Sequence, residues 1–226
     1  MAVETEVRES ARRLRASRVW YGVLFAVVLA SLTWQTVLVV QGGTDVNAGE
    51  SAAHEDLAVR LVRLASYFTI QSNVLVCVGA LLLMLRPGRD SPAFRVLHLD
   101  ALLGIAITGL VFATILAPLV DLEGAALVVN AGLHFVAPVA TVLGWILVGP
   151  RGRVDRATIA RAFVWPVAWI AYTLVHGAFS GWYPYPFLDV AEIGYPMALL
   201  NIVLVLVVAF LLALLASWAD RKLVRK

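Results

Sequence analysis

Two pairs of polar side chains stand out because they lie in otherwise apolar parts of the sequence. Thr69 and Asn73 come at the head of one apolar run, and Asn130 and His134 come within another. A threonine hydroxyl and an imidazole are the smallest set that supports nucleophilic acyl transfer, in which the hydroxyl attacks and the imidazole takes its proton. Asn73 or Asn130 can orient the base or donate to the developing oxyanion. A structural hydrogen-bond network uses the same residue types, so spacing alone leaves both interpretations open.

The elements that carry these residues follow from the composition. The chain has 226 residues, of which 61% are hydrophobic and 15% are charged, and its mean hydropathy is +0.86. These values are typical of multi-span membrane proteins and not of soluble globular domains. The lone Cys77 provides neither a disulfide framework nor a cysteine metal motif. Because the basic residues are spread between apolar segments and form no single face, we expect no binding of nucleic acid.

Six apolar segments are close to the roughly 20 residues that cross a hydrocarbon core. Inside lipid such segments must be helices, because every backbone polar group needs a partner within its own segment. We therefore predict one all-α domain over residues 1–226, a polytopic bundle of six transmembrane helices. The predicted spans are Val19–Val40, Leu64–Leu85, Leu99–Val120, Ala125–Val148, Phe163–Phe179 and Tyr195–Trp218.

Basic residues are concentrated in alternate connections between these segments. They fill residues 1–18, the second and fourth connections, and residues 219–226, whereas the other three connections are acidic apart from Arg60 and Arg63. The positive-inside rule then places both termini in the cytoplasm, with residues 1–18 as a charged tail and residues 219–226 as a basic tail. We expect a multi-pass protein of the plasma membrane.

With this topology, polar side chains from several helices reach the same level in the outer half of the bundle. Residues four apart on a helix share a face, which groups the members of each polar pair. Polar groups inside a membrane are costly and tend to be functional, so a cluster at one level predicts a buried polar cavity. The side chains expected at this level are Thr69, Asn73, Asn130, His134, His176 and Asn201.

The loop over residues 181–189 is expected to close the same outer face. Its alternating aromatic residues and prolines cannot continue a helix. Trp and Tyr favour the membrane interface, so the loop is predicted to be a rigid amphipathic lid, or else an aromatic belt that only anchors the bundle. Its candidate ligand-facing side chains are Trp182, Tyr183, Tyr185 and Asp189.

Other functions fit the sequence less well. His134 and His176, with Asp189, suggest a haem or metal site, but the chain has no HExxH or similarly spaced helical pair. A proton-coupled carrier would carry intramembrane carboxylates or interrupted helices in related halves. A signalling or scaffolding protein remains an alternative, in which the cavity is a ligand site. The sequence assigns no role to His98.

The polar motifs and the lid together resemble a bacterial family of six-helix membrane proteins. That family is similar to the animal androgen-induced and androgen-dependent membrane proteins, which hydrolyse fatty acid esters of hydroxy fatty acids. The resemblance covers nearly all of the chain from the first span to the sixth. The residues that carry it are Phe68-Thr69, Gln71-Ser72-Asn73, Asn130, Leu133-His134, Pro138, Gly177 and the run Trp182-Tyr183-Pro184-Tyr185-Pro186-Phe187-Leu188-Asp189.

The resemblance implies a lipid-ester hydrolase with Thr69 as nucleophile and His134 as general base. Asn73, Asn130 and His176 would then be oxyanion or supporting groups. Ala131 stands where the animal proteins have a second histidine, and the residues after Thr69 are more polar than theirs. The expected partner is a membrane lipid or a fatty-acyl ester that enters from the outer leaflet, with no cofactor and no metal, and no oligomeric state is implied. The alternative is a non-catalytic lipid-binding, signalling or scaffold protein.

Overall fold

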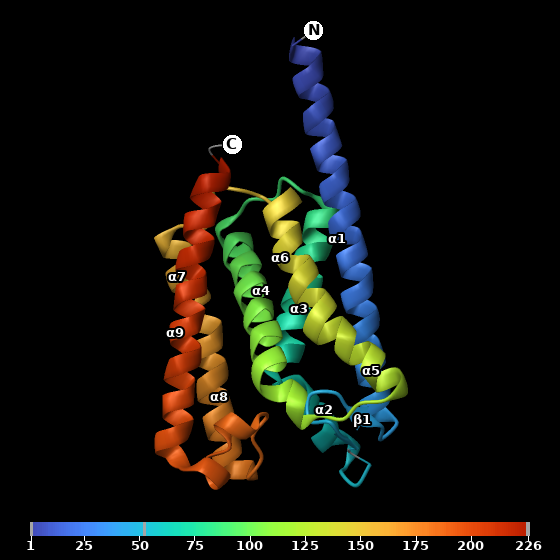
Figure 1. The fold of residues 1–226 in the computed structure, drawn as a ribbon, viewed down its shortest axis with the longest axis vertical. Helices are drawn as coiled ribbons and strands as arrows, with labels where there is room; N and C mark the ends of the chain where they lie inside the picture. The colour runs from blue at the N-terminus through green and yellow to red at the C-terminus, as the bar shows by residue number, and fades with distance from the viewer. Residues whose placement is uncertain (1, 52, 225–226) are drawn as a thin grey trace.

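The protein is an all-α polytopic bundle, described by a computed structural model for residues 2–51 and 53–224 (Figure 1). Within these residues, six helical spans are long and apolar enough to cross a membrane, which confirms the predicted fold class. Four of them, the first, third, fifth and sixth, extend beyond the predicted segments over charged residues. The spans are Ala11–Val40, Phe68–Leu85, Pro92–Leu119, Gly124–Val148, Arg156–Ser180 and Val190–Val224.

The spans are assembled from helices of different kinds, joined by short connections. The α-helices are α1 (Ala2–Val40), α2 (Leu57–Ser66), α3 (Phe68–Leu85), α4 (Pro92–Val111), α5 (Gly124–Ala131), α6 (Ala137–Val148), α7 (Arg156–Ala162), α8 (Val164–Ser180) and α9 (Val190–Val224). Two π-helical segments, η1 (Phe112–Leu116) and η3 (Gly132–Val136), and two 3₁₀ turns, η2 (Ala117–Leu119) and η4 (Pro186–Leu188), complete the helical elements. A two-residue strand, β1 (Thr44–Asp45), pairs antiparallel with β2 (Glu50–Ser51).

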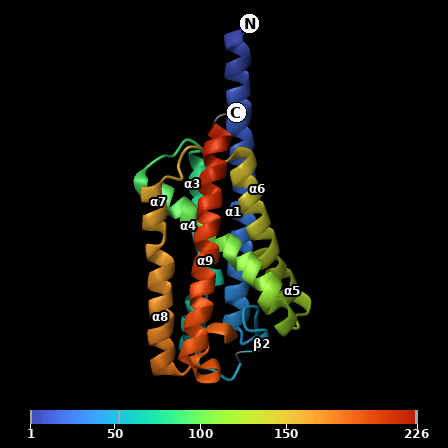
Figure 2. The same ribbon diagram turned by 60° about the vertical axis from the view of Figure 1, so that its left-hand side comes forward.

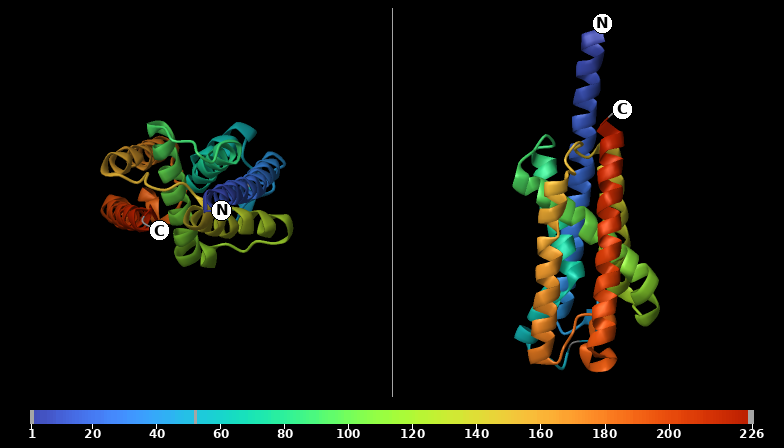
Figure 3. Two further views of the ribbon diagram at one scale, coloured as in Figure 1. Left: turned by 90° about the horizontal axis from the view of Figure 1, so that it is seen from above. Right: turned by 90° about the vertical axis from the view of Figure 1, so that its left-hand side faces the viewer.

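The two ends of the bundle differ in what they carry. Both chain termini lie at one end, where α1 projects beyond the other helices (Figures 1 and 3). We call this the terminal end; it also holds the arginine-bearing connections after α3 and α6. The opposite end, here the loop end, holds the β1–β2 hairpin, α2 and the connection between α8 and α9. The helices α8 and α9 stand next to each other along one side of the bundle (Figures 2 and 3).

The predicted helix Leu64–Leu85 is wrong at its start, because the chain breaks at Tyr67. There the backbone is extended (φ −66°, ψ 130°), so α2 ends at Ser66 and α3 begins at Phe68. The break frees backbone groups that need partners inside the bundle. The Trp169 indole N–H of α8 donates to the Ser66 carbonyl at 2.8 Å, and the Ser66 and Tyr172 hydroxyls are 2.7 Å apart. Thr69 therefore lies in the first turn of a helix.

Prolines explain both π-helical segments. A proline has no N–H, so it cannot donate to the carbonyl four residues earlier. One residue before each proline, the N–H reaches five residues back: Ala117 donates to Phe112, before Pro118, and Ala137 donates to Gly132, before Pro138. Such π turns are rare and are frequent at functional sites. Here they face one another, because the rings of Phe112 and His134 stack with centroids 3.9 Å apart.

A buried carboxylate holds the terminal end together. Asp220, near the end of α9, accepts hydrogen bonds from the backbone N–H groups of Gly152, Arg153 and Val154 at 2.9, 2.7 and 3.0 Å. Ser217, one turn earlier, donates to the Val154 carbonyl at 2.9 Å. The connection between α6 and α7 is thus fastened to the last helix by side chains of α9.

The two basic residues of the loop end both have structural partners. Arg60 donates to the Val39 carbonyl at 2.6 Å, which satisfies a free carbonyl at the end of α1. Arg63 lies 3.1 Å from Glu55, and its guanidinium is 5.3 Å from the ring centroid of Trp182. Arg60 and Arg63 therefore have structural roles at the loop end, which explains why its otherwise acidic connections contain two basic residues.

Candidate functional site

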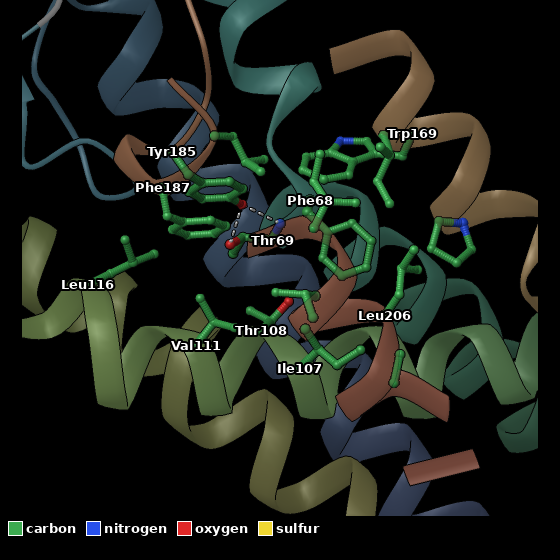
Figure 4. A pocket seen from close by; sticks show the side chains of 16 residues that line it. Phe68, Thr69, Ile107, Thr108, Val111, Leu116, Trp169, Tyr185, Phe187 and Leu206 are labelled. Carbon is green, nitrogen blue, oxygen red and sulfur yellow. Dashed lines mark hydrogen bonds between the residues drawn. The ribbon is translucent and has the colours of Figure 1, made fainter. Parts of the chain in front are cut away.

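Thr69 is paired with a tyrosine of the connection between α8 and α9. The Tyr185 hydroxyl accepts a hydrogen bond from the Thr69 backbone N–H at 3.1 Å and lies 3.2 Å from the Thr69 hydroxyl (Figure 4). Thr69 is 2% exposed and Tyr185 is 5% exposed. The N–H of a residue in the first turn of a helix has no partner within that helix. Tyr185 supplies the partner for the Thr69 N–H. A hydroxyl pair therefore sits at the positive end of the α3 dipole.

The hydroxyl pair borders a narrow apolar pocket of about 60 Å³. Phe68 and Thr69 of α3 form one wall, α4 and α8 form others, and α9 closes the pocket (Figure 4). Its polar lining side chains are Thr69, Thr108 and Tyr185. Such a pocket suits an apolar group with one polar function at the hydroxyl end. The other lining residues are Ile107, Val111, Leu116, Pro166, Trp169, Ile170, Phe187, Leu188, Ile202, Val205, Leu206 and Ala209.

Replacing Tyr185 with phenylalanine tests whether the phenol assists chemistry at Thr69. The variant removes the acceptor of the Thr69 N–H and the partner of its hydroxyl, but keeps the ring that stacks on Phe187. We expect the rate of covalent labelling of Thr69 by a fluorophosphonate to fall about a hundredfold, the effect of losing one oxyanion donor. Tyr183→Phe, in the same loop, is the control. Labelling at the wild-type rate in Tyr185→Phe would contradict this role.

Asn73 connects Thr69 to the helix that carries His134. Its amide group donates to the Thr69 carbonyl at 2.9 Å and to the Leu133 carbonyl at 3.3 Å. One buried amide thus joins the first turn of α3 to η3, one residue before His134. The bridge joins the two polar pairs, but of the six side chains expected to form one polar cavity only Thr69 lines the pocket.

The His134 ring makes no hydrogen bond to the Thr69 hydroxyl in this structure. Neither of its nitrogens makes a well-formed hydrogen bond among the described residues, although the backbone carbonyl of Asn130 is close to the ring and the side chain is only 1% exposed. Buried polar groups are nearly always paired, so an unpaired imidazole is a site for a ligand, a water or a moved side chain. Four other buried side-chain oxygens of the adjacent elements also have no hydrogen-bond partner among the described residues; they belong to Ser72, Asn73, Thr108 and Asn130.

The remaining candidates fasten the connection between α8 and α9 to the bundle. Asn201 donates to the Phe187 carbonyl at 2.9 Å, and Asp189 accepts from the Ala191 N–H at 3.0 Å. The Trp182 ring packs edge-on against Tyr67 and His176, with centroids 5.5 and 5.9 Å apart. Of the loop candidates, Tyr185 reaches Thr69, Trp182 and Tyr183 pack on the bundle, and Asp189 bonds the backbone at the start of α9.

The two histidines proposed for haem or a metal lie in different surroundings. His176 is on α8, where its Nδ1 is 3.2 Å from the Ser180 hydroxyl, while His134 stacks on Phe112. Among the residues that the structure describes, no three His, Cys, Asp or Glu side chains converge. Tyr183 packs over Gly177, where a Cβ would collide with its ring. These contacts pack the two histidines and Tyr183 against neighbouring residues and give no set of metal ligands among the described residues.

Sequence reasoning missed a buried carboxylate near the hydroxyl pair. Asp45, in the β1–β2 hairpin, accepts from Gln35 at 3.0 Å and from the amide and backbone N–H of Asn47 at 2.8 and 3.0 Å. The pKa of Tyr185 is raised to about 12, mainly by burial and also by the negative charge of Asp45, while the hydrogen bonds with Thr69 lower it. The one available signal was Gln35, a long polar side chain within the first span.

Asp45 makes stability depend on pH. Burial raises the pKa of its carboxyl above the ordinary 3.8, although both hydrogen bonds from Asn47 lower it. The folded state therefore binds the proton more tightly than the unfolded state, and stability falls as pH rises from 3.8 through the folded-state pKa. We expect the stability of Asp45→Asn not to fall with pH in this way, and the variant to be more stable than wild type at pH 8. The new amide can donate to the side-chain oxygens of Gln35 or Asn47, which lack partners among the described residues.

Thermal unfolding in detergent between pH 4 and pH 8 measures this effect. Asp56→Asn changes an exposed carboxyl of the same connection and should leave the pH dependence as in wild type. If the unfolding temperatures of Asp45→Asn and wild type differ by a constant amount across this range, Asp45 is not the source of the pH dependence.

Comparisons with known proteins add no assignment to this geometry. The chain matches no protein-family model, no curated protein and no solved structure. The site is therefore interpreted from its own residues: a buried Thr69–Tyr185 hydroxyl pair, an amide bridge to η3 and an unpaired imidazole.

Proposed function

We propose that the protein is an intramembrane hydrolase of fatty-acyl esters, with Thr69 as nucleophile and His134 as general base. The observation that carries the proposal is the hydroxyl pair of Thr69 and Tyr185 at the end of a narrow apolar pocket. A polar function at the end of an apolar channel matches the shape of an acyl ester. The resemblance to lipid-ester hydrolases, carried by the Thr69, His134 and lid motifs, points the same way.

The proposed reaction uses Thr69, His134 and the polar groups at the first turn of α3. The Thr69 oxygen attacks the ester carbonyl carbon while its proton passes to His134, and the protonated imidazole then gives the proton to the departing alcohol. Water then attacks the acyl-threonine and loses a proton to His134, which passes it to the Thr69 oxygen as the fatty acid leaves. The Thr69 N–H, which donates to Tyr185 in this structure, and the Tyr185 hydroxyl are suited to stabilise the oxyanion at the positive end of the α3 dipole.

The proton transfer requires His134 and Thr69 to approach each other. Catalytic hydrogen bonds are often long in unliganded sites and form only in the complex with substrate. Asn73 already bridges the two backbones, so a change of side-chain rotamer is a smaller step than a helix movement. The unpaired nitrogens of His134 leave the ring free to accept that proton.

The proposed orientation follows the charges of the connections. Arginines at the terminal end support a cytoplasmic location for both termini in the plasma membrane. The pocket at the loop end would then receive its ester from the outer leaflet. The apolar lining supports lateral entry of an acyl chain.

Activity-based labelling tests the proposal. Purified wild-type protein in detergent is treated with a fluorophosphonate and the modified residue is identified by mass spectrometry, beside turnover of a fatty-acyl ester. Modification of Thr69 together with turnover that His134→Ala removes is the expected result. Well-folded protein that neither reacts nor hydrolyses the ester would sink the proposal.

A non-catalytic acyl-chain binding protein is the second candidate, favoured by one observation. The Thr69 hydroxyl is paired with Tyr185 and not with His134, which is also how a purely structural hydroxyl behaves. Under this alternative a fatty acid would stabilise the protein against heat while the fluorophosphonate leaves Thr69 unmodified.

A further inference from the structure

A second cavity lies at the terminal end, far from Thr69 along the helices. It measures about 540 Å³, and its lining includes Arg12, Arg13, Arg151 and Arg153. The first two come from α1, and the other two from the connection between α6 and α7. Two segments that are more than a hundred residues apart in the sequence therefore contribute arginines to the same cavity. The remaining lining residues are Leu14, Ala16, Ser17, Pro87, Leu147, Val148, Gly149, Pro150 and Leu223.

The positive charge of this cavity is held in place. Arg151 donates to the carbonyls of Trp145 and Ile146 at the end of α6, and Arg153 donates to the Arg89 carbonyl. Bonds to neutral carbonyls fix the position of a guanidinium without cancelling its charge. Burial lowers the pKa of Arg151, and the nearby charge of Arg13 lowers it further.

Neighbouring carboxylates are largely committed to other partners. Asp220 accepts three backbone N–H groups of the α6–α7 connection. Asp90 binds Arg95 at 2.6 Å and lies 3.5 Å from Arg153. These partners leave Arg12, Arg13 and Arg151 with no ion pair among the described residues.

The buried hydroxyl of Tyr21, beside the cavity, also has no hydrogen-bond partner among the described residues. Tyr21 is 2% exposed, and its hydroxyl makes no hydrogen bond to any described residue. It lies against Gly149, which lines the cavity: a Cβ on Gly149 would be 2.9 Å from the Tyr21 oxygen. Buried polar groups are nearly always satisfied, so this hydroxyl, which is next to the lining residue Gly149 and does not itself line the cavity, is free to accept or donate a hydrogen bond. This observation is independent of the arginines.

We propose that the cavity binds a phosphate-bearing anion, held by Arg12, Arg13 and Arg151. Guanidinium groups recognise phosphate oxygens through paired N–H donors. The apolar part of α1 begins at Val19, about two turns after Arg12 and Arg13, so the cavity lies at the edge of the membrane-spanning region, where lipid headgroups are found. The anion is therefore a phospholipid headgroup or a free phosphate compound. This site does not depend on the activity proposed for Thr69.

The test compares two double variants of equal charge. Arg12→Gln/Arg13→Gln removes two cavity residues, and Arg15→Gln/Arg18→Gln removes two arginines of the same helix that do not line the cavity. Each purified protein is titrated with phosphatidylglycerol or phosphatidylcholine in detergent, and bound lipid is counted by native mass spectrometry. Retention of folding is checked by size-exclusion elution.

Phosphatidylglycerol is expected to bind wild type in preference to phosphatidylcholine, and its affinity should fall on the order of tenfold in the cavity variant and far less in the control. Tyr21→Phe, which changes no charge, should also weaken it. Competition by inorganic phosphate would assign the site to a free anion; binding that phosphate does not displace would assign it to a lipid. Equal loss in both double variants, or no preference between the two lipids, would overturn the site.

Discussion

Thr69→Ala is expected to abolish modification by a fluorophosphonate and to lower kcat/KM for a fatty-acyl ester by a factor on the order of a thousand or more. The hydroxyl is the proposed nucleophile, so no other group in the pocket replaces it. The side chain is small, and its loss leaves the Thr69 N–H bonded to Tyr185. The variant should therefore fold, and thermal unfolding in detergent checks that it does.

Thr108→Ala is the matched control for this result. Thr108 lines the same pocket, and its hydroxyl has no hydrogen-bond partner among the described residues. Thr108→Ala removes the same volume and the same hydroxyl group from the pocket as Thr69→Ala does, but it leaves the proposed nucleophile in place. We expect Thr108→Ala to be labelled at nearly the wild-type rate and Thr69→Ser to retain labelling. If Thr69→Ala is labelled like wild type, Thr69 is not the nucleophile.

Asp220→Ala is expected to have the largest effect on stability, lowering the free energy of unfolding by about 3 kcal/mol. Three backbone N–H groups would lose their acceptor at once, and each unsatisfied buried donor costs about 1–3 kcal/mol, less where water reaches it. The connection between α6 and α7 would also be freed from α9. Unfolding in mixed detergent micelles measures the change.

Asp155→Ala gives the comparison for this prediction. Asp155 caps α7 by accepting from the Thr158 N–H at 2.7 Å, and its loss should cost about 1 kcal/mol, the usual value of a helix cap. Asp220→Asn keeps an acceptor oxygen and should fall between wild type and Asp220→Ala. Equal destabilisation by Asp155→Ala and Asp220→Ala would show that the three N–H groups find other partners.

The fold class and the spans were predictable because lipid allows few solutions. Apolar runs of membrane length must be helices there, so composition and spacing decide the architecture. The same reasoning predicted that Thr69 and His134 lie at a similar level, and the Asn73 amide bonds the carbonyls of Thr69 and of Leu133, which precedes His134. It did not predict the break at Tyr67, because no proline or glycine marks it.

The partners of the site residues depend on distant parts of the chain. Tyr185 reaches Thr69 across 116 positions, and Trp169 reaches the Ser66 carbonyl across 103. Local periodicity says nothing about such pairs, since it reports only which residues share a helix face. Asp45 was missed for the same reason, because a carboxylate in a short connection looks solvated until the hairpin folds inward.

By itself the sequence determined the membrane-spanning helices, the distribution of charge between their connections and the polar residues worth examining. Only the tertiary structure decided that the Thr69 hydroxyl meets Tyr185, that His134 is left without a hydrogen-bond partner, and that four arginines line one cavity. The physical reason is that hydropathy is a local property of each segment. A buried polar group, in contrast, is satisfied by whichever element the packing brings beside it.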